Sequence, residues 1–306
     1  MQVEQLLSMQ KQKIKRRVIR LSDSYPIKKS GAAKQNIFIR EIPICSGGVG
    51  AGLWEAGEMM SRWIYRNSDA IKANFTGCLE LGSGVGLTGI VMSTFIPTVM
   101  TDYKQALLQN LRYNIWSNSD CTDKDDLFNT PAEFTYFKSH AELIKQNAQI
   151  AYIDWFDLNQ LNPPEEDFER AQLLPFNQSL NLINIISNKF NLIIGSELNY
   201  CVETVDALVN TLEKYLNKNG VFWEIISLFR GVGPKLFMTK LKNNGFEVEA
   251  REAEEYMYNG IESCQRKRNE TYMMWTIYKK GTANVMTFGN GPLVDWENIE
   301  YTLAAE

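Results

Sequence analysis

The chain has 306 residues, 44% of them hydrophobic and 22% charged, which is long enough to bury one sizeable core. Its formal net charge of −4 excludes the global basic field that dominates non-specific nucleic-acid binding, so we expect no nucleic-acid partner. The five cysteines are odd in number and scattered, without a CxxC pair or zinc-ligand spacing. We therefore interpret them as reduced thiols and expect no metal site.

The sequence also bears on location and on hydrolytic chemistry. It contains no run of about 18 apolar residues and no short apolar block of the secretory type at its N-terminus. We therefore expect no membrane association and a cytoplasmic protein, with a nuclear or mitochondrial location left open. The single histidine, His140, lies in a polar stretch without catalytic neighbours, which argues against Ser-His-Asp and Cys-His hydrolases. The oligomeric state stays open.

The N-terminal segment, residues 1–33, is expected to hold a basic amphipathic helix. Between residues 3 and 21, aliphatic side chains recur at helical spacing and lysines and arginines occupy the remaining positions. A solvated face, a partner-docking surface and a mitochondrial presequence are the alternatives for it. Further on, residues 37–39 and 42–44 alternate around Arg40 and Glu41, which predicts two short paired strands.

Apolar runs then alternate with amphipathic segments, a pattern typical of a βαβ sheet. The runs that predict strands are 78–81, 98–101, 151–153, 192–194, 221–226, 246–250 and 272–278. Helical periodicity over 205–216 closes at Asn219-Gly220, and a second helix is expected near 234–244. We predict one domain over 34–280 with insertions near 117–148 and 162–188, followed by a tail, 281–306. In this tail, Phe288, Trp296 and Tyr301 are candidates to pack back on the domain.

The strongest functional signal is the sequence Glu80-Leu-Gly-Ser-Gly-Val-Gly86, between an apolar run and a helical pattern. Glycines at 82, 84 and 86 let the backbone turn sharply and let a nucleotide-type ligand approach main-chain N–H groups. The spacing also fits a dinucleotide fingerprint, with Asp102 at the end of the next strand placed for ribose hydroxyls. A dehydrogenase is therefore a rival, disfavoured because no substrate domain follows.

Three further features favour a nucleotide-type ligand other than a dinucleotide. Glu80 precedes the first glycine by two residues, where an acid suits a cationic amino acid better than a pyrophosphate. Asp154-Trp155 ends the third strand, where a carboxylate can accept from an adenine amino group and an indole can cover the ring. Glu197 and Tyr200 follow the fourth strand at the carboxyl edge, where open α/β sheets bind ligands.

In this order the motifs resemble methyltransferase family 16, the seven-strand protein lysine methyltransferases, over roughly residues 35–280. Residues 50–57 resemble the family's Gly-x-x-x-Trp segment, and residues 79–89 are very similar to its cofactor loop. Asp154-Trp155 matches the adenine-side dipeptide, and Glu197-x-x-Tyr200 the acidic-x-x-Tyr signature that borders the lysine channel. The chain departs from the pattern in having Glu197 where Asp is commoner, Cys201 where an acid or proline often stands, and longer insertions.

The resemblance implies an α/β fold, a Rossmann-like seven-stranded methyltransferase sheet with helices on both faces and the last strand antiparallel. It implies S-adenosylmethionine as cofactor and a protein lysine as acceptor, with Glu197 and Tyr200 aligning the amine. The implied cofactor-binding residues are Gly50, Trp54, Glu80, Gly82, Gly84, Gly86, Asp102, Asp154 and Trp155. Methylation of histidine or of a small molecule on the same fold, and a non-catalytic assembly protein that keeps the cofactor site, are the alternatives.

Overall fold

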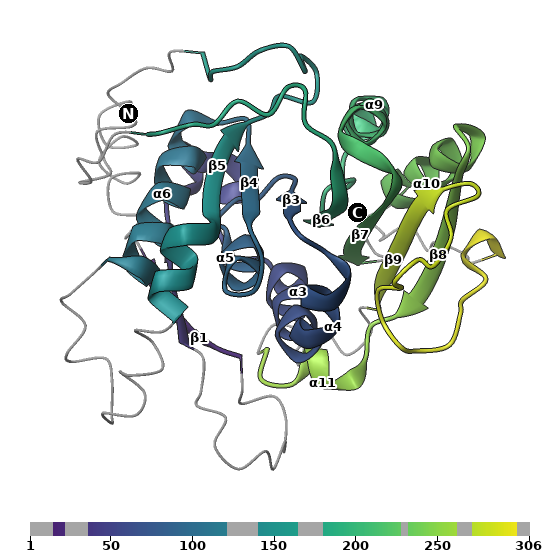
Figure 1. Cartoon of the computed structure of the whole chain (residues 1–306), viewed down its shortest axis with the longest axis horizontal. Helices are drawn as coiled ribbons and strands as arrows, with labels where there is room; N and C mark the ends of the chain where they lie inside the picture. The colour runs from purple at the N-terminus through teal and green to yellow at the C-terminus, as the bar shows by residue number, and fades with distance from the viewer. Residues whose placement is uncertain are drawn as a thin grey trace, which may run out of the picture.

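A seven-stranded mixed sheet forms the centre of the computed structural model, which describes residues 15–21, 36–120, 140–164, 180–227, 232–261 and 271–298 (Figure 1). The strand order is β5-β4-β3-β6-β7-β9-β8. The strands are β3 (Cys78–Glu80), β4 (Thr98–Asp102), β5 (Ala148–Tyr152), β6 (Phe190–Ser196), β7 (Leu216–Ser227), β8 (Phe246–Glu252) and β9 (Tyr272–Lys279). Only the last strand, β9, runs antiparallel to its neighbours in this sheet, so the predicted fold class is confirmed.

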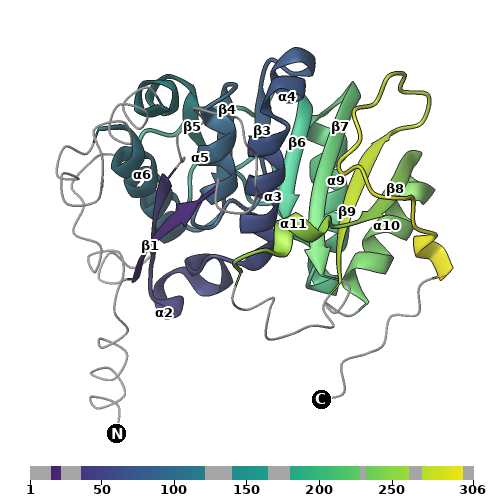
Figure 2. The same ribbon diagram turned by 90° about the horizontal axis from the view of Figure 1, so that it is seen from below.

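Helices cover both faces of this sheet (Figures 1 and 2). The α-helices that carry labels are α2 (Ile44–Gly47), α3 (Glu55–Arg66), α4 (Ser68–Asn74), α5 (Leu87–Ser93), α6 (Gln105–Ser119), α9 (Val205–Tyr215), α10 (Gly233–Asn243) and α11 (Glu255–Tyr258). The 3-10 helices are η1 (Gly48–Ala51), η3 (Val202–Thr204) and η4 (Trp296–Asn298). Helices α3, α5 and α6 share one buried cluster with Trp223 of β7, and α9 and α10 share the other with Phe222. Successive side chains of a strand point to opposite faces, so β7 contributes to both halves of the core.

The predicted N-terminal helix is wrong for residues 15–20, and residues 1–14 lie outside the described part of the chain. Lys15–Arg20 forms strand β1, which pairs antiparallel with β2 (Asn36–Glu41) in a separate two-stranded sheet. Val18 is 43% exposed whereas Ile19 is buried and lies opposite Ile37, which is the alternation of a strand with one buried face. The non-local partner β2 thus overrides the local helical periodicity.

Two other sequence predictions need correction. The strand pair predicted at 37–39 and 42–44 is one strand, β2, because Pro43 has no N–H to continue a ladder and Ile44 begins α2. The helix expected to close at Asn219-Gly220 ends at Tyr215, because Leu216 already pairs with Phe190 in the parallel ladder.

The predicted insertions and tail are described in part. Residues 140–147 are helical, whereas 121–139 and 165–179 lie outside the described residues, as does Tyr301. Phe288 is fully buried, with ring centroids 4.9 Å from Trp63 and 5.8 Å from Trp223. Trp296 packs edge-on against Trp275, so these parts of the tail belong to the core.

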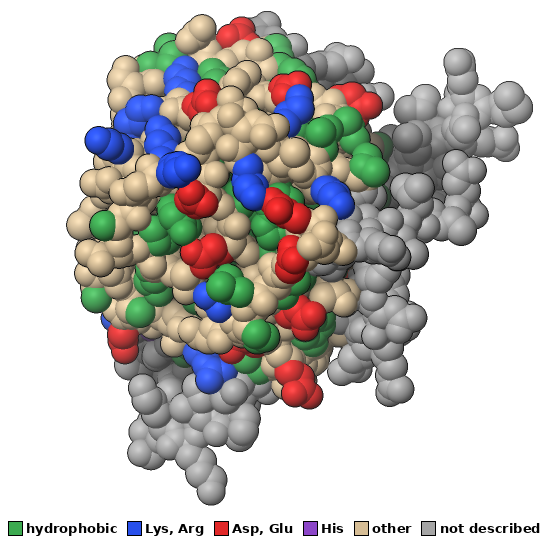
Figure 3. Space-filling view, turned by 90° about the vertical axis from the view of Figure 1, so that its right-hand side faces the viewer, with side chains coloured by type: hydrophobic (Ala, Val, Ile, Leu, Met, Phe, Trp, Pro, Cys, Tyr) green, Lys and Arg blue, Asp and Glu red, His purple; other side chains and the backbone are tan. Residues whose placement is uncertain are grey.

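The face of the molecule in Figure 3 carries charges of both signs. Among the described residues, no helix is both long and apolar enough to cross a membrane. The face in Figure 3 carries lysine and arginine side chains beside aspartate and glutamate side chains. This mixture matches the small net charge of the chain.

Candidate active site

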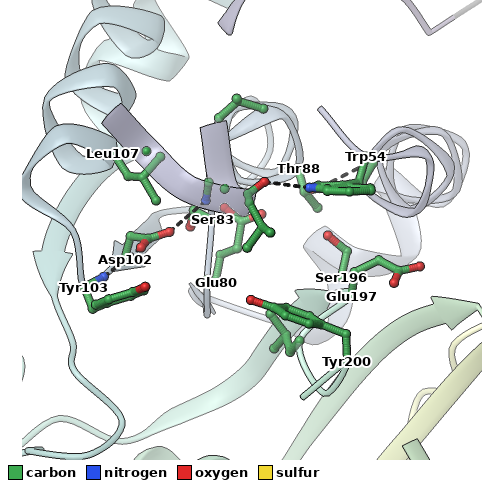
Figure 4. Close-up of a pocket in the computed structure, with 18 of the residues that line it drawn as sticks. Trp54, Glu80, Ser83, Thr88, Asp102, Tyr103, Leu107, Ser196, Glu197 and Tyr200 are labelled. Carbon is green, nitrogen blue, oxygen red and sulfur yellow. Dashed lines mark hydrogen bonds between the residues drawn. The ribbon is translucent and has the colours of Figure 1, made fainter. Parts of the chain in front are cut away.

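A cavity of about 340 Å³ opens where β3, β4, β5 and β6 end, beside the segment from α2 to α3 (Figure 4). It brings together ten of the eleven residues that the sequence assigned to the site. These are Gly50, Trp54, Glu80, Gly82, Gly84, Asp102, Asp154, Trp155, Glu197 and Tyr200. Gly86 is not among the lining residues; it precedes α5 as its N-cap with a φ of 83°.

The glycine loop after β3 requires its glycines for two separate reasons. Gly84 has a φ of 52°, in the left-handed region that residues with a Cβ rarely adopt. A Cβ on Gly84 would also lie 2.9 Å from the carbonyl oxygen of Gly50. The loop and the Gly50 segment therefore touch through their backbones, and together they form one wall of the cavity.

Asp102 at the end of β4 fixes this loop. Its Oδ2 accepts a hydrogen bond from the N–H of Gly84 at 3.0 Å, and its Oδ1 accepts one from the N–H of Tyr103 at 2.8 Å (Figure 4). Burial raises the pKa of Asp102, and the backbone N–H groups of Gly84 and Tyr103 oppose that rise. Each carboxylate oxygen has further lone pairs, so the same group can accept from two ligand hydroxyls.

Glu80 is a buried carboxyl at the end of β3 whose Oε2 has no hydrogen-bond partner among the described residues. Burial raises the pKa of Glu80 to about 8, although hydrogen bonds from Ser83 and Gly89 partly counter this effect. A buried acid in this state is suited to a cationic partner, which would satisfy the oxygen and favour the ionised form.

The acidic and basic side chains in the described lining of the cavity are all carboxylic. Four carboxylic side chains line it, Glu80, Asp102, Asp154 and Glu197, and the described lining contains no lysine, arginine or histidine. A pyrophosphate would find no cationic side chain in this lining, whereas a ligand with positive groups would be stabilised by the ionised carboxylates. The cavity thus favours a cationic nucleotide derivative over a dinucleotide.

The ends of β4 and β5 supply the aromatic side of the cavity. Oδ1 of Asp154 accepts from the N–H of Phe156 at 2.9 Å, which orients the carboxylate in a tight turn. The indole of Trp155 lies beside Gly82, so that a Cβ added at Gly82 would contact the indole ring. Tyr103 and Phe156 also line the cavity and were not predicted from the sequence. Tyr103 directly follows Asp102 and Phe156 lies two residues after Asp154, so their positions beside acids at strand ends could have indicated them.

The turn after β6 presents Glu197 and Tyr200 in different ways. Figure 4 shows the hydroxyl of Tyr200 directed into the cavity, and this side chain is 49% exposed. The Oε1 of Glu197 instead accepts from the N–H of Ser227 on β7 at 3.1 Å. The Tyr200 hydroxyl therefore faces the cavity, while one oxygen of Glu197 is committed to the backbone.

Trp54 closes the cavity on the opposite side. Its Nε1 donates to the carbonyl oxygen of Val49 at 2.8 Å, which fixes the indole at the rim (Figure 4). Within the described ranges, no group of three or more His, Cys, Asp or Glu side chains is arranged to hold a metal ion. The polar groups of the site are thus hydrogen-bonding side chains and backbone amides.

Comparison with known proteins agrees with this geometry. Residues 34–130 match the family model described as lysine methyltransferase, which confirms the resemblance over that segment. An uncharacterized protein of Dictyostelium discoideum is 28% identical over 177 residues, which are 56% of this chain and 42% of that protein. The chain thus spans less than half the length of this relative.

Two solved structures that resemble this chain are distant from it in sequence. A TehB-like SAM-dependent methyltransferase from Corynebacterium glutamicum is 15% identical with a TM-score of 0.42, over 78% of this chain and 92% of that one. An O-methyltransferase from Bacillus cereus in complex with SAH is 9% identical with a TM-score of 0.41, over 76% and 85%. These likenesses are too remote to bear on the chemistry. The chain thus combines a seven-stranded mixed sheet and a cavity at its carboxyl edge with similarity, over residues 34–130, to the lysine methyltransferase family.

Proposed function

We propose that the protein transfers a methyl group from S-adenosylmethionine to a lysine side chain of another protein. The observation that carries this proposal is the cavity with four carboxylic side chains and no basic one in its described lining. The cofactor has a sulfonium and an ammonium group, and the acceptor arrives as a third cation. Each of them gains from the surrounding carboxylates.

The described residues fit the parts of this cofactor in turn. The buried Oε2 of Glu80 suits the ammonium group, which would supply its missing hydrogen-bond donor. Asp102, already oriented by Gly84, suits the two ribose hydroxyls. Asp154 and Trp155 suit the amino group and the face of the adenine ring. The glycine loop lets the ligand lie against the backbone.

When bound, the cofactor supplies an electrophilic methyl carbon on sulfur, and the chain itself contributes mainly position. The amine nitrogen has to lie in line with that carbon and the sulfur while water is excluded. In this proposal Tyr200 orients the amine through its hydroxyl, which points into the cavity, and Trp54 narrows the rim on the other side. An ammonium has no lone pair, so the amine must first lose its proton, and nearby carboxylates favour the charged form. Alignment is therefore the expected role of Glu197 and Tyr200.

Protein as the acceptor is supported by the exposure of the rim. Tyr200 and Trp54 are both partly open to solvent, so a side chain on a folded partner can reach them. The acidic-x-x-Tyr signature, Glu197 to Tyr200, and the family described as lysine methyltransferase support lysine in particular.

Transfer of label from methyl-labelled S-adenosylmethionine to a cell lysate tests the acceptor. Acid hydrolysis and amino-acid separation should give methylated lysine, with much less of it in a parallel reaction containing Asp102→Ala. Label that elutes as methyl-histidine, or that stays in small molecules, would overturn the lysine assignment.

A further inference from the structure

A buried carboxyl group from the neighbouring strand holds the turn that carries Glu197 and Tyr200. We call residues 196–200 the acceptor turn. Glu224 lies in the middle of β7, opposite Gly195, and its side chain is fully buried. Its Oε1 accepts from the N–H of Leu198 at 3.2 Å, and its Oε2 accepts from Nδ2 of Asn199 at 3.0 Å. Both oxygens therefore bind the acceptor turn.

The acceptor turn needs such support because its backbone is unfavourable. Glu197 has a φ of 57°, in the left-handed region that a residue with a Cβ rarely occupies. Two more bonds tie it to β7, from the N–H of Glu197 to the carbonyl of Ile225 and from the N–H of Ser227 to Oε1 of Glu197. A conformation of this kind persists only where the surroundings impose it.

Burial of the Glu224 carboxyl group among core side chains costs free energy. Glu224 shares its face of β7 with Phe222 and Ile226 of the core, and no ion pair to it occurs in the described part of the chain. Burial, together with the nearby Glu197, raises the pKa of Glu224 to about 8, although the hydrogen bonds from Leu198 and Asn199 oppose this rise. An apolar side chain of similar size would serve a purely structural purpose at lower cost. What it could not do is accept hydrogen bonds from Leu198 and Asn199.

We infer that Glu224 is a positioning residue for methyl transfer, which acts through Leu198 and Asn199 to hold the acceptor turn so that the Tyr200 hydroxyl enters the cavity. The kinetic consequence rests on the proposed function. The effect on the conformation of the turn does not, and it can be measured without any cofactor.

Two substitutions separate the hydrogen bonds from the volume. Glu224→Leu keeps the bulk and removes both acceptors. Glu224→Gln keeps an oxygen for Leu198, and its amide can donate to Oδ1 of Asn199, which is buried without a partner in the described structure. We therefore expect Glu224→Gln to retain the turn and Glu224→Leu to release it. Thr211→Val is a matched control, because the Thr211 hydroxyl is buried and, among the described residues, bonds only to Ala207 within its own helix.

Hydrogen exchange of the peptide spanning the acceptor turn provides the first readout. Glu224→Leu should exchange at Leu198 roughly ten-fold faster or more, as expected for the loss of buried hydrogen bonds. Glu224→Gln and Thr211→Val should exchange as the unmodified protein does. Unchanged exchange in Glu224→Leu would overturn the inference, whether or not the protein is a methyltransferase.

Kinetics provide the second readout. Glu224→Leu should lower kcat/KM for the acceptor roughly ten- to a hundred-fold and leave the Kd for S-adenosylmethionine within about two-fold. Equal losses of both would show a general disturbance and overturn the positioning role. Should Glu224→Leu not fold, Asn199→Ala removes one of the two bonds without altering β7, and a smaller change in the same direction is expected. Wild-type exchange and kinetics in Asn199→Ala would then contradict the inference.

Discussion

The N–H of Gly84 donates to the carboxylate of Asp102 across 3.0 Å, and this bond joins the glycine loop after β3 to the end of β4. One carboxylate thus both orders the loop and faces the cavity. Cofactor affinity and loop geometry should therefore respond together when either residue changes.

Gly84→Ala should abolish measurable cofactor binding. The new Cβ would lie 2.9 Å from the carbonyl oxygen of Gly50. The alanine would also have to adopt the left-handed conformation of this position, which costs about 1–2 kcal/mol for a residue with a Cβ. Gly245→Ala is the matched control, because Gly245 has a φ of 81° but open space around its Cβ position. Calorimetry should show normal affinity for Gly245→Ala. Equal affinity in the two variants would mean that the loop does not touch the ligand.

Asp102→Ala should weaken binding of S-adenosylmethionine by at least about ten-fold, since a hydrogen bond to a charged group contributes about 1.5–3 kcal/mol. Asp102→Asn should lose less, because one oxygen remains to accept a bond. Far-ultraviolet circular dichroism should stay native in both variants. Unchanged affinity in a folded Asp102→Ala would remove Asp102 from the site.

The raised pKa of Glu80 predicts that stability of the ligand-free protein falls as pH rises. The folded protein keeps a proton on Glu80 up to about pH 8, whereas an unfolded chain releases it near the ordinary value of 4.5. Between these values the native state binds more protons, so the free energy of unfolding decreases with increasing pH. Thermal unfolding of Glu80→Gln should depend less on pH over this window. Glu224 contributes in the same direction, so part of the slope should remain.

We also expect the Glu80 carboxyl group to release a proton when the cofactor binds. An ammonium beside Glu80 favours the carboxylate and so lowers its pKa from about 8. Affinity should therefore rise from about pH 6 to 8, and the binding enthalpy should vary with the ionisation enthalpy of the buffer. Glu80→Gln should lose both dependences. The absence of proton release from the unmodified protein would contradict contact between Glu80 and a cationic group.

Tyr200→Phe should lower turnover by roughly ten-fold while the Kd for the cofactor stays unchanged, because the hydroxyl faces the acceptor side. Tyr278→Phe is the matched control, since its hydroxyl donates to Glu249 at the far edge of the sheet. A parallel loss of cofactor affinity in Tyr200→Phe would place this side chain on the cofactor instead.

The central sheet and most of the site could be predicted from sequence for a single physical reason. Parallel strands buried on both faces are continuous apolar runs, and ligands bind where such strands end. Residues after those runs, such as Asp102, Asp154 and Tyr200, therefore had to meet at one edge of the sheet.

The features that escaped prediction depend on non-local pairing. Residues 15–20 satisfy a helical and a strand pattern alike, and only the partner β2 decides between them. Glu224 stands inside an apolar run, and its contact with Leu198 follows from the register of β7 against β6. Gly86 belongs to the motif but serves the start of α5, which depends on the path of the loop.

Calorimetric titration of the purified protein with S-adenosylmethionine, its demethylated product and NAD tests the central claim most directly. An acidic cavity without basic lining in its described part should bind the first two at one site and NAD not at all. Binding of NAD with comparable or higher affinity, or no binding of S-adenosylmethionine, would contradict the account.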